Sequence, residues 1–334
     1  MSTIIEVSKL AGVSRTTVSR LINKSGYVSE QTREKIEQAI KDVNYHPNRL
    51  AQSLHTKTSS TVALVVGDIS NPITAVYTKA IENIVYQNNY NLIVCNTGFD
   101  IEKEIAYVNM LVEKQVDGII LAPSGDEKKE HLKLLQIRHI PFVFLTRKIL
   151  GINADYVHFD NVQGSYQVVE HLISLGHRNI GAIVRRVDYS EQANRLKGYR
   201  LALQEHGIAY KESNIRYDIA NEQGGYDDMA ELMELQDTPT AVYTATNVQA
   251  AGVIRYCREF NLKIPRDIAI GSFESFSDFD PMMNPQLTAN IMPVDELGTV
   301  SAELLFRRIG GDTGTYKEVS LTGSLVIRES SVGK

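Results

Sequence analysis

Thr3-Ile-Ile-Glu-Val-Ser-Lys-Leu-Ala-Gly-Val-Ser-Arg-Thr-Thr-Val-Ser-Arg-Leu-Ile-Asn23 contains two short helical patterns separated by a turn. Glu6 lies three positions after Thr3, which is the spacing of a capping box at the start of a helix. Gly12 permits the backbone of a tight turn and ends this first segment. The apolar positions between the cap and the turn have helical spacing: Val7, Leu10 and Ala11.

Two further helices follow the turn. Ser14 can cap the second helix, Gly26 ends that segment, and Ser29 can cap the third. Their inward positions are predicted to be Val18, Leu21 and Ile22 in the second helix, and Ile36, Ala39, Ile40 and Val43 in the third. A helix, a turn of about three residues with glycine, a second helix and a supporting helix form the helix-turn-helix pattern.

The second helix carries a polar outward face that suits DNA. Its members are Arg15, Thr16, Thr17, Ser19, Arg20 and Asn23. Arginine can donate two hydrogen bonds to guanine, and threonine can contact a thymine methyl. A solvated polar helix face would have the same composition, so the pattern alone leaves that alternative open.

The charge of the chain is unevenly distributed. Residues 1–58 carry nine Lys/Arg against five Asp/Glu, whereas the whole chain of 334 residues has 35 against 40 and a net charge of −5. A basic head on an acidic body indicates an anionic partner for the head alone.

Two runs resemble the LacI/GalR family of bacterial transcription regulators. Ile5-Glu-Val-Ser-Lys-Leu-Ala-Gly-Val-Ser-Arg-Thr-Thr-Val-Ser-Arg20 is similar to the headpiece of that family, and Asn44-Tyr-His-Pro-Asn-Arg-Leu-Ala-Gln-Ser-Leu54 is similar to its hinge helix. The resemblance implies that Arg15 and Thr16 are variable base readers and that Arg20 is the commoner base contact. The full set of DNA-binding residues it implies is Thr3, Ser14, Arg15, Thr16, Thr17, Arg20 and Asn23, with Asn48, Ala51 and Leu54 in the hinge. Leu54 would be an apolar wedge in the minor groove.

From Thr61 onward, apolar strands alternate with helical segments. Continuous apolar strands separated by helices predict parallel sheets covered on both faces, here as two doubly wound subdomains. In such sheets ligands bind at the carboxyl ends of the strands, and the space between two subdomains is the natural pocket.

The body is similar to the periplasmic-binding-protein-like core of the same family. Matching motifs are Asp68-Ile-Ser-Asn-Pro72, Val116-Asp-Gly-Ile-Ile-Leu-Ala-Pro123, Asp160-Asn161, His171-Leu-Ile-Ser-Leu-Gly-His177, Gly198-Tyr199 and Arg328-Glu-Ser. The family's chain crosses between subdomains three times, and we expect crossings near 158, 288 and 320. The predicted organisation is a helix-turn-helix head over 1–46, a hinge helix and linker over 47–58, a first core subdomain over 59–158 plus 289–319, and a second over 159–288 plus 320–334.

The resemblance also implies an effector pocket, with several departures. Arg195 matches the arginine that commonly grips the effector, and Asp160 matches an Asp-Asn element. Ile73-Thr74, Thr146, Thr246 and Glu274 replace more common aromatic, aspartate or asparagine residues. With Arg147, the predicted effector-binding residues are therefore Ile73, Thr74, Thr146, Arg147, Asp160, Arg195, Thr246 and Glu274. The departures, with Arg147 and Arg185 at strand ends, favour an anionic sugar, although Glu274 would also suit a neutral one.

Little in the chain indicates catalysis or a cofactor. Phosphate-loop, dinucleotide-binding, zinc-protease and serine-hydrolase motifs are absent from the sequence. Asp227-Asp228 is interpreted as a helix start and Asp278/Asp280 as a loop, while His171 and His177 are interpreted as a helix cap and a surface contact. The two cysteines, Cys95 and Cys257, form no Cys-x-x-Cys pair, so we expect neither a metal nor a cofactor.

These features together predict a cytoplasmic DNA-binding regulator, most simply a repressor of a carbohydrate-utilisation operon. We expect it to bind a palindromic operator and to respond to a small carbohydrate-like effector. No leucine heptad of a tetramerising tail follows Arg328, so we expect a homodimer. We expect no membrane partner, because the chain has neither a signal peptide nor an apolar run long enough to span a bilayer. The alternative is a ligand-binding or enzymatic α/β protein with a fused basic head.

Overall fold

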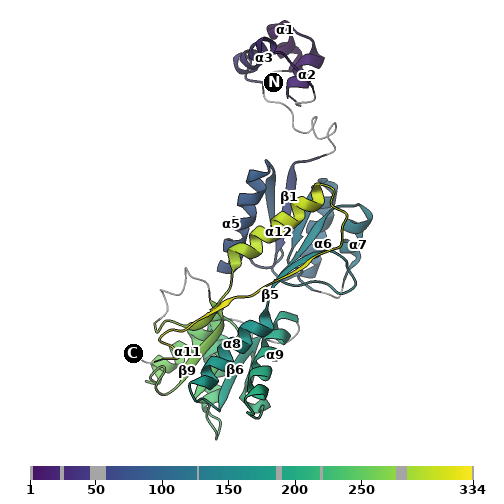
Figure 1. The fold of residues 1–334 in the computed structure, drawn as a ribbon. Coiled ribbons are helices and arrows are strands. Elements are labelled where there is room, and N and C mark those ends of the chain that lie inside the picture. The colour runs from purple at the N-terminus through teal and green to yellow at the C-terminus, as the bar shows by residue number, and fades with distance from the viewer. Residues whose placement is uncertain are drawn as a thin grey trace. The chain divides into compact units, whose positions relative to one another are not determined.

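The computed structural model describes residues 3–22, 26–45, 58–125, 128–185, 190–218, 221–275 and 284–332. Two compact units make up the chain, one containing the N-terminal head and the other an α/β core (Figure 1). The α/β fold with helix-turn-helix helices at its N-terminus is the predicted fold class.

The head consists of three helices packed on one small apolar core. They are α1 (Ile4–Ala11), α2 (Arg15–Ile22) and α3 (Glu30–Asp42). Val7, Val18 and Ile36 are fully buried where the helices meet. One side chain from each helix therefore closes the core, as the apolar spacing predicts.

Two details of the head differ from the prediction. Leu10 is 55% exposed, and Ser8 is buried in its place with its hydroxyl donating to the carbonyl of Ile5. An eight-residue helix that packs against α3 buries only a narrow stripe, which passes through Val7 and Ala11 and leaves Leu10 outside it. Ser29 occupies the N-cap position of α3, but its hydroxyl bonds to the hydroxyl of Thr32 and does not cap the helix.

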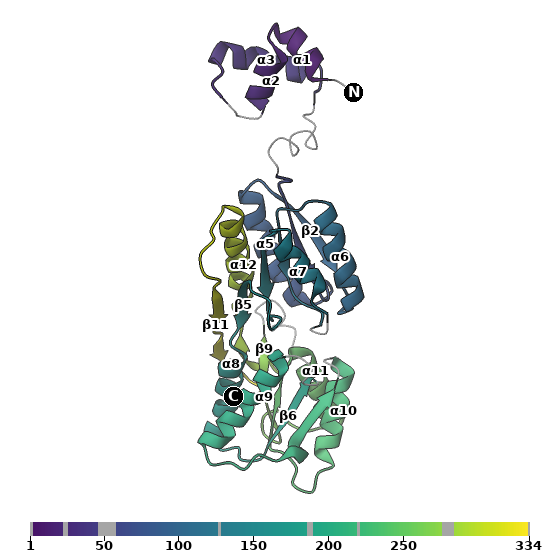
Figure 2. The same cartoon turned by 90° about the vertical axis from the view of Figure 1, so that its right-hand side faces the viewer.

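The first core subdomain is a six-stranded sheet covered on both faces. Its strands are β1 (Thr61–Val66), β2 (Asn91–Asn96), β3 (Gly118–Leu121), β4 (Phe142–Leu145), β5 (Asp155–Phe159) and β11 (Glu318–Leu321), in the order β11-β5-β4-β3-β1-β2. Helices α5 (Pro72–Gln87) and α12 (Val294–Ile309) pack together on one face, while α6 (Ile101–Glu113) and α7 (Glu130–Ile137) cover the other (Figure 2). Every residue of β3 and β4 is buried, which explains their continuous apolar sequence.

The second core subdomain repeats this plan. Its strands are β6 (Ile180–Arg185), β7 (Ile215–Asp218), β8 (Ala241–Thr244), β9 (Ala269–Ser275), β10 (Thr288–Ile291) and β12 (Ser324–Val326), in the order β12-β10-β9-β8-β6-β7. Helices α8 (Asn161–Ser174) and α9 (Ser190–Glu205) pack as one pair, and α10 (Glu222–Met233) and α11 (Asn247–Glu259) as another. Strand β12 runs antiparallel to its neighbour β10, whereas β10 runs parallel to β9.

The chain crosses between the two sheets three times, slightly later each time than expected. The crossings follow Phe159, Ile291 and Leu321, because β5 and β11 lie in the first sheet and β10 in the second. The predicted crossing near 288 is therefore wrong by a few residues, and the one near 320 falls inside β11. Each strand completes its ladder before the chain leaves the sheet.

Candidate functional site

The exposed side of α2 carries the predicted base-reading residues. Arg15, Thr16 and Arg20 are exposed, whereas Val18 on the opposite side is fully buried. The first turn of α2 contains no acidic residue, so its amino end can accept a phosphate without repulsion. The structure thus presents a basic helix face of the kind that enters a major groove.

The turn before α2 is fixed by two local caps. Thr3 and Glu6 form a reciprocal capping box at the start of α1, as predicted. The Ser14 hydroxyl accepts the backbone N–H of Thr17 at 3.1 Å and lies 2.8 Å from the Thr17 hydroxyl. Gly12 has a φ of 67° and connects the two helices in a left-handed conformation. Gly12 and Ser14 thus mark the end of α1 and the start of α2.

Gly26 supports Arg20 in a way that the sequence does not reveal. A methyl group at residue 26 would lie 2.8 Å from Cδ of Arg20, so the arginine stem rests against the glycine backbone. The predicted DNA-binding residues Asn23, Asn48, Ala51 and Leu54 lie outside the described residues.

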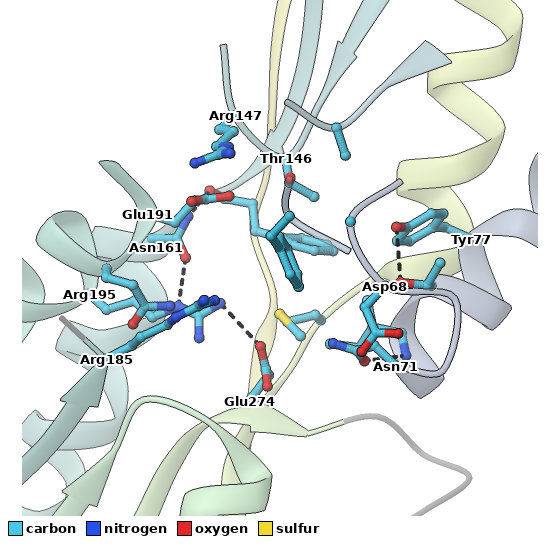
Figure 3. Close-up of a pocket in the computed structure, with 18 of the residues that line it drawn as sticks. Asp68, Asn71, Tyr77, Thr146, Arg147, Asn161, Arg185, Glu191, Arg195 and Glu274 are labelled. Atoms are coloured by element: carbon cyan, nitrogen blue, oxygen red, sulfur yellow. Dashed lines mark hydrogen bonds and ion pairs between the residues drawn. The ribbon is translucent and has the colours of Figure 1, made fainter. Parts of the chain in front are cut away.

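The core contains a pocket of about 180 Å³ between its two sheets (Figure 3). Most of its lining follows the carboxyl ends of strands, the position expected for a doubly wound sheet. The lining residues are Gly67, Asp68, Asn71, Ile73, Thr74, Tyr77, Phe99, Ala122, Pro123, Thr146, Arg147, Phe159, Asn161, Arg185, Glu191, Gln192, Arg195, Glu274 and Met292.

Arg195 is held firmly at one wall of the pocket. Its Nε donates to Oδ1 of Asn161 at 2.9 Å, and its Nη2 lies 3.2 Å from Oε1 of Glu274 (Figure 3). Its Nη1 donates to the carbonyl of Ala245, and the guanidinium lies 4.0 Å from the ring centroid of Phe273. The guanidinium is therefore preorganised, and only part of its donor capacity remains for a ligand.

Partly buried Glu274 and buried Tyr77 are titratable groups of the lining. Burial raises the pKa of the Glu274 carboxyl, and the adjacent Arg195 guanidinium offsets part of that rise. Burial also raises the pKa of Tyr77 to about 12, so its hydroxyl stays neutral and bonds to the Thr74 hydroxyl at 3.1 Å. The pocket thus offers the carboxyl group of Glu274 and the neutral hydroxyl of Tyr77.

The other two arginines approach from the ends of β4 and β6. Arg147 is buried and donates to the carbonyl of Pro123, while Thr146 before it has a φ of 64°. The guanidinium of Arg185 lies 5.4 Å from the ring centroid of Phe99. Arg185 and Phe99, which both line the pocket, are thus within cation–π distance of each other.

A buried network holds the loops of the first sheet in place. Glu104 is completely buried, accepts the backbone N–H of Ser124, and lies 2.8 Å from Nε2 of His131. The Ser124 hydroxyl lies 2.7 Å from the hydroxyl of Thr97, whose N–H donates to the carbonyl of Val66. The loops after β1, β2 and β3 are thereby tied together. They supply Gly67, Asp68, Phe99, Ala122 and Pro123 to the lining.

Six of the eight predicted effector residues come together in the pocket: Ile73, Thr74, Thr146, Arg147, Arg195 and Glu274. Asp160 and Thr246 do not line it. Asp160 caps α8 by accepting the N–H of Gln163, and Thr246 caps α11 by accepting the N–H of Gln249. Both side chains point toward their own helices, because a cap directs its oxygen at the helix start.

Several residues of the lining were not predicted from the sequence. Glu191 and Gln192 precede Arg195 by four and three positions on α9, a spacing that places them on the same helix face. Helical spacing from Arg195 was thus a usable signal. Phe99, Phe159 and Met292 follow or end strands, and their convergence depends on the three-dimensional fold.

The structure describes four of the residues considered for catalysis: Asp227, Asp228, His171 and His177. Asp227 and Asp228 lie in the middle of α10, so their interpretation as a helix start is wrong; the helix begins at Glu222. His171 contacts the hydroxyl of Ser331 and His177 that of Thr240. Within the described ranges no group of three His, Cys, Asp or Glu could hold a metal ion. Asp278 and Asp280 lie outside those ranges.

Comparison with known proteins agrees with this architecture. Residues 3–48 match the model of the bacterial regulatory proteins of the lacI family, and residues 169–331 match the periplasmic binding protein-like domain. The transcriptional regulator DegA of Bacillus subtilis is 33% identical over 99% of this chain and 98% of its own length. This chain belongs to the LacI family.

Two solved structures extend the likeness to the whole chain. The lac repressor dimer bound to operator and an anti-inducer has a TM-score of 0.88 at 25% identity, covering 99% of each chain. The complex of the regulator CelR with cellobiose has a TM-score of 0.74 at 30% identity, covering 99% of this chain and 100% of CelR. The present LacI-family protein is a DNA-binding transcription regulator with a ligand-binding core. No helix in its described segments has the length and apolar character needed to cross a membrane.

Proposed function

We propose that this regulator binds a palindromic operator as a homodimer and that α2 reads the bases. The support is the exposed, basic face of α2, together with the likeness to the lac repressor dimer on its operator. In this proposal Arg15, Thr16 and Arg20 contact base edges. Thr3, Ser14, Thr17 and Asn23 contact the phosphate backbone or support the readers.

The hinge is proposed to complete the operator contact. Asn48 and Ala51 would contact the minor groove, and Leu54 would insert between base pairs at the centre of the operator. Insertion of the wedge costs free energy because it unstacks a base step. The resulting bend offsets this cost by allowing more contacts between protein and DNA.

The effector is proposed to be a small carbohydrate-like molecule in the pocket around Arg195. A single water needs roughly 10–15 Å³ of such space, so about 180 Å³ holds on the order of a dozen waters, close to the number of non-hydrogen atoms in a hexose. Planar polar groups and aromatic rings surround this space, which suits a ring with hydroxyl edges and apolar faces. The cellobiose complex of CelR supports the same ligand class.

The charges of the lining favour a neutral sugar over an anionic one. Three arginines face three acids, Asp68, Glu191 and Glu274, so the formal charges cancel. Arg195 already faces Glu274, which weakens its pull on a second anion. An anionic sugar held by Arg147 or Arg185 is the second candidate, because both guanidinium groups line the same cavity.

Gln192 supports a ligand that donates hydrogen bonds. The residue is 8% exposed and lines the pocket, and its Oε1 has no hydrogen-bond partner among the described residues. A buried acceptor without a partner costs about 1–3 kcal/mol, and a sugar hydroxyl would remove that cost.

Effector and operator binding are proposed to be linked through the two core subdomains. The ligand touches both sheets, so it favours the arrangement of subdomains in which those contacts are best made. It can change operator affinity only by its differential affinity for the two arrangements.

Operator binding is tested by selecting a site from random DNA and measuring its affinity for the full chain. Arg20→Ala should cost about 1–3 kcal/mol at the selected site and less on random DNA. Arg33→Ala removes the same charge from the exposed side of α3 and is the matched control. Equal losses on both DNAs for Arg20→Ala would make Arg20 a backbone contact.

The effector is tested by a thermal-shift screen of neutral sugars, sugar acids and sugar phosphates. A ligand at 100 times its Kd adds about 2.7 kcal/mol of stability. Binding of a neutral sugar that does not weaken with salt supports the first candidate, whereas salt-sensitive binding of an anion supports the second. Turnover of the bound sugar would instead favour the alternative of an enzymatic α/β protein.

A further inference from the structure

The segment that leads into β1 is held by one carboxylate. Asp117, the last residue before β3, accepts the backbone N–H of Ser59 on Oδ1 at 2.9 Å and that of Ser60 on Oδ2 at 2.8 Å. Its own N–H donates to the carbonyl of Thr61 at 2.8 Å. Both oxygens of a single side chain thus fix two consecutive peptide groups.

The backbone at this point adopts a conformation that needs support. Ser60 has a φ of 48°, in the left-handed region that disfavours residues with a Cβ. The Thr61 hydroxyl also donates to the carbonyl of Ser59 at 3.1 Å. A residue outside the preferred region persists only where its surroundings hold it, and here the Asp117 carboxylate supplies that hold.

Asp117 is connected to the effector pocket by two paired strands. The register of β1 and β3 runs from Val62 opposite Gly118 to Val65 opposite Leu121. At their carboxyl ends these strands lead directly to four pocket residues: Gly67, Asp68, Ala122 and Pro123. The two strands therefore form a continuous hydrogen-bonded connection between the pocket loops and their amino ends, where Asp117 bonds to Ser59 and Ser60.

We propose that Asp117 is the positioning residue for operator binding in this chain. Its carboxylate fixes Ser59 and Ser60, which join the linker of the DNA-binding head to β1. Effector binding changes operator affinity by acting on this segment through Asp117. This inference rests on the proposed effector control, while Asp117 belongs neither to the DNA-reading face nor to the lining of the pocket.

The test compares Asp117→Asn and Asp117→Ala with the wild type as full-length proteins. Asparagine keeps one acceptor oxygen, so we expect a graded loss of operator affinity that reaches at least tenfold in Asp117→Ala. The change in operator affinity caused by a ligand from the screen should shrink in the same order. Ligand Kd should stay within twofold, because the pocket is intact.

Two further measurements separate positioning from general destabilisation. Asp267→Ala is the matched control, since Asp267 likewise accepts a backbone N–H, from Lys263 at 2.7 Å, in a turn of the second subdomain. It should leave operator affinity and the ligand response within twofold. Amide hydrogen exchange should show protection of the Ser59 and Ser60 N–H groups in the wild type and its loss in Asp117→Ala.

Some outcomes would overturn the inference. These are an unchanged operator affinity in a folded Asp117→Ala protein, or a loss that matches that of Asp267→Ala at equal melting temperature. Failure of the proposed function itself looks different, because then the wild type shows no ligand response on operator DNA. If Asp117→Ala does not fold, Asp117→Asn decides between the same outcomes.

Discussion

Gln192 lines the pocket with a buried side-chain oxygen that has no hydrogen-bond partner among the described residues. Replacing it with leucine removes a buried oxygen that has no partner within the described structure, at similar volume. We therefore expect Gln192→Leu to weaken effector binding by about 1–3 kcal/mol and to leave the melting temperature unchanged or higher. Calorimetric titration and thermal unfolding give the two values.

Gln204→Leu is the control for this change, because Gln204 lies on the same helix but is exposed. It should leave effector affinity as in the wild type. Tight effector binding by Gln192→Leu would show that the ligand does not use this side chain.

His171 makes the folded protein sensitive to acid. Burial lowers the pKa of its imidazole below the ordinary 6.5, with a smaller contribution from His177. The imidazole therefore binds a proton more weakly in the folded chain than in the unfolded chain. As a result, the folded state loses stability as the pH falls through about 6.5. The loss levels off below the pKa of the folded state. Urea unfolding of wild type and His171→Gln at pH 7.5 and 5.5 should show a smaller decrease in the variant.

His139→Gln serves as the comparison, since His139 is exposed. It should keep the wild-type difference between the two pH values. A His171→Gln protein that loses as much stability as the wild type would refute this assignment.

At the residue scale, local chemistry was predictable and long-range chemistry was not. The caps at Thr3 and Ser14 follow from spacing within one helical turn. Asp160 shows the limit, because the same carboxylate fits a helix cap and a pocket wall, and only the structure decides. Glu104 could not be recognised, since its partners come from other loops.

The helix pair α10–α11 depends on a close backbone approach. A methyl group at residue 252 would lie 2.0 Å from the carbonyl oxygen of Glu222 and 2.6 Å from the backbone N of Tyr226. Backbone atoms cannot move aside as a side chain can, so Gly252→Ala must separate the helices. We expect a loss of about 1–3 kcal/mol or more in unfolding free energy, measured by urea denaturation.

Gly310→Ala is the milder counterpart. A methyl group there would meet the carbonyl of Phe306 at 3.3 Å, at the end of α12. The expected loss is smaller than that for Gly252→Ala. Equal losses of unfolding free energy in the two variants would show that the close approach of α10 and α11 at Gly252 adds no stability.

At the element scale, periodicity predicted the most continuously apolar strands but not every strand, nor where the chain changes sheets. Buried runs such as β3, β4 and β8 are apolar throughout and stand out in the sequence. The short strand β12 has exposed and half-buried residues and carries no such signal. Its antiparallel pairing with β10 is seen only in the assembled sheet.

The molecule as a whole combines a helix-turn-helix head with a core that contains a pocket between two sheets. Its family and its α/β organisation could be recognised from the head and from the strand-helix alternation. The lining of the pocket could be predicted only in part. Six of the eight predicted effector residues line it, but the rest of the lining comes from strand ends and helices far apart in the sequence. Three crossings bring these segments together.

Operator affinity measured with and without a pocket ligand tests the account most directly. The full chain is titrated onto its selected operator by fluorescence anisotropy, at zero and at saturating sugar, for wild type and Arg195→Gln. We predict that the sugar changes the wild-type operator Kd by about 5–150-fold. Arg195→Gln should have the operator Kd of the sugar-free wild type, and the same sugar concentration should leave that Kd unchanged. A sugar that calorimetry shows to fill the pocket, yet leaves the operator Kd unchanged, would contradict the account.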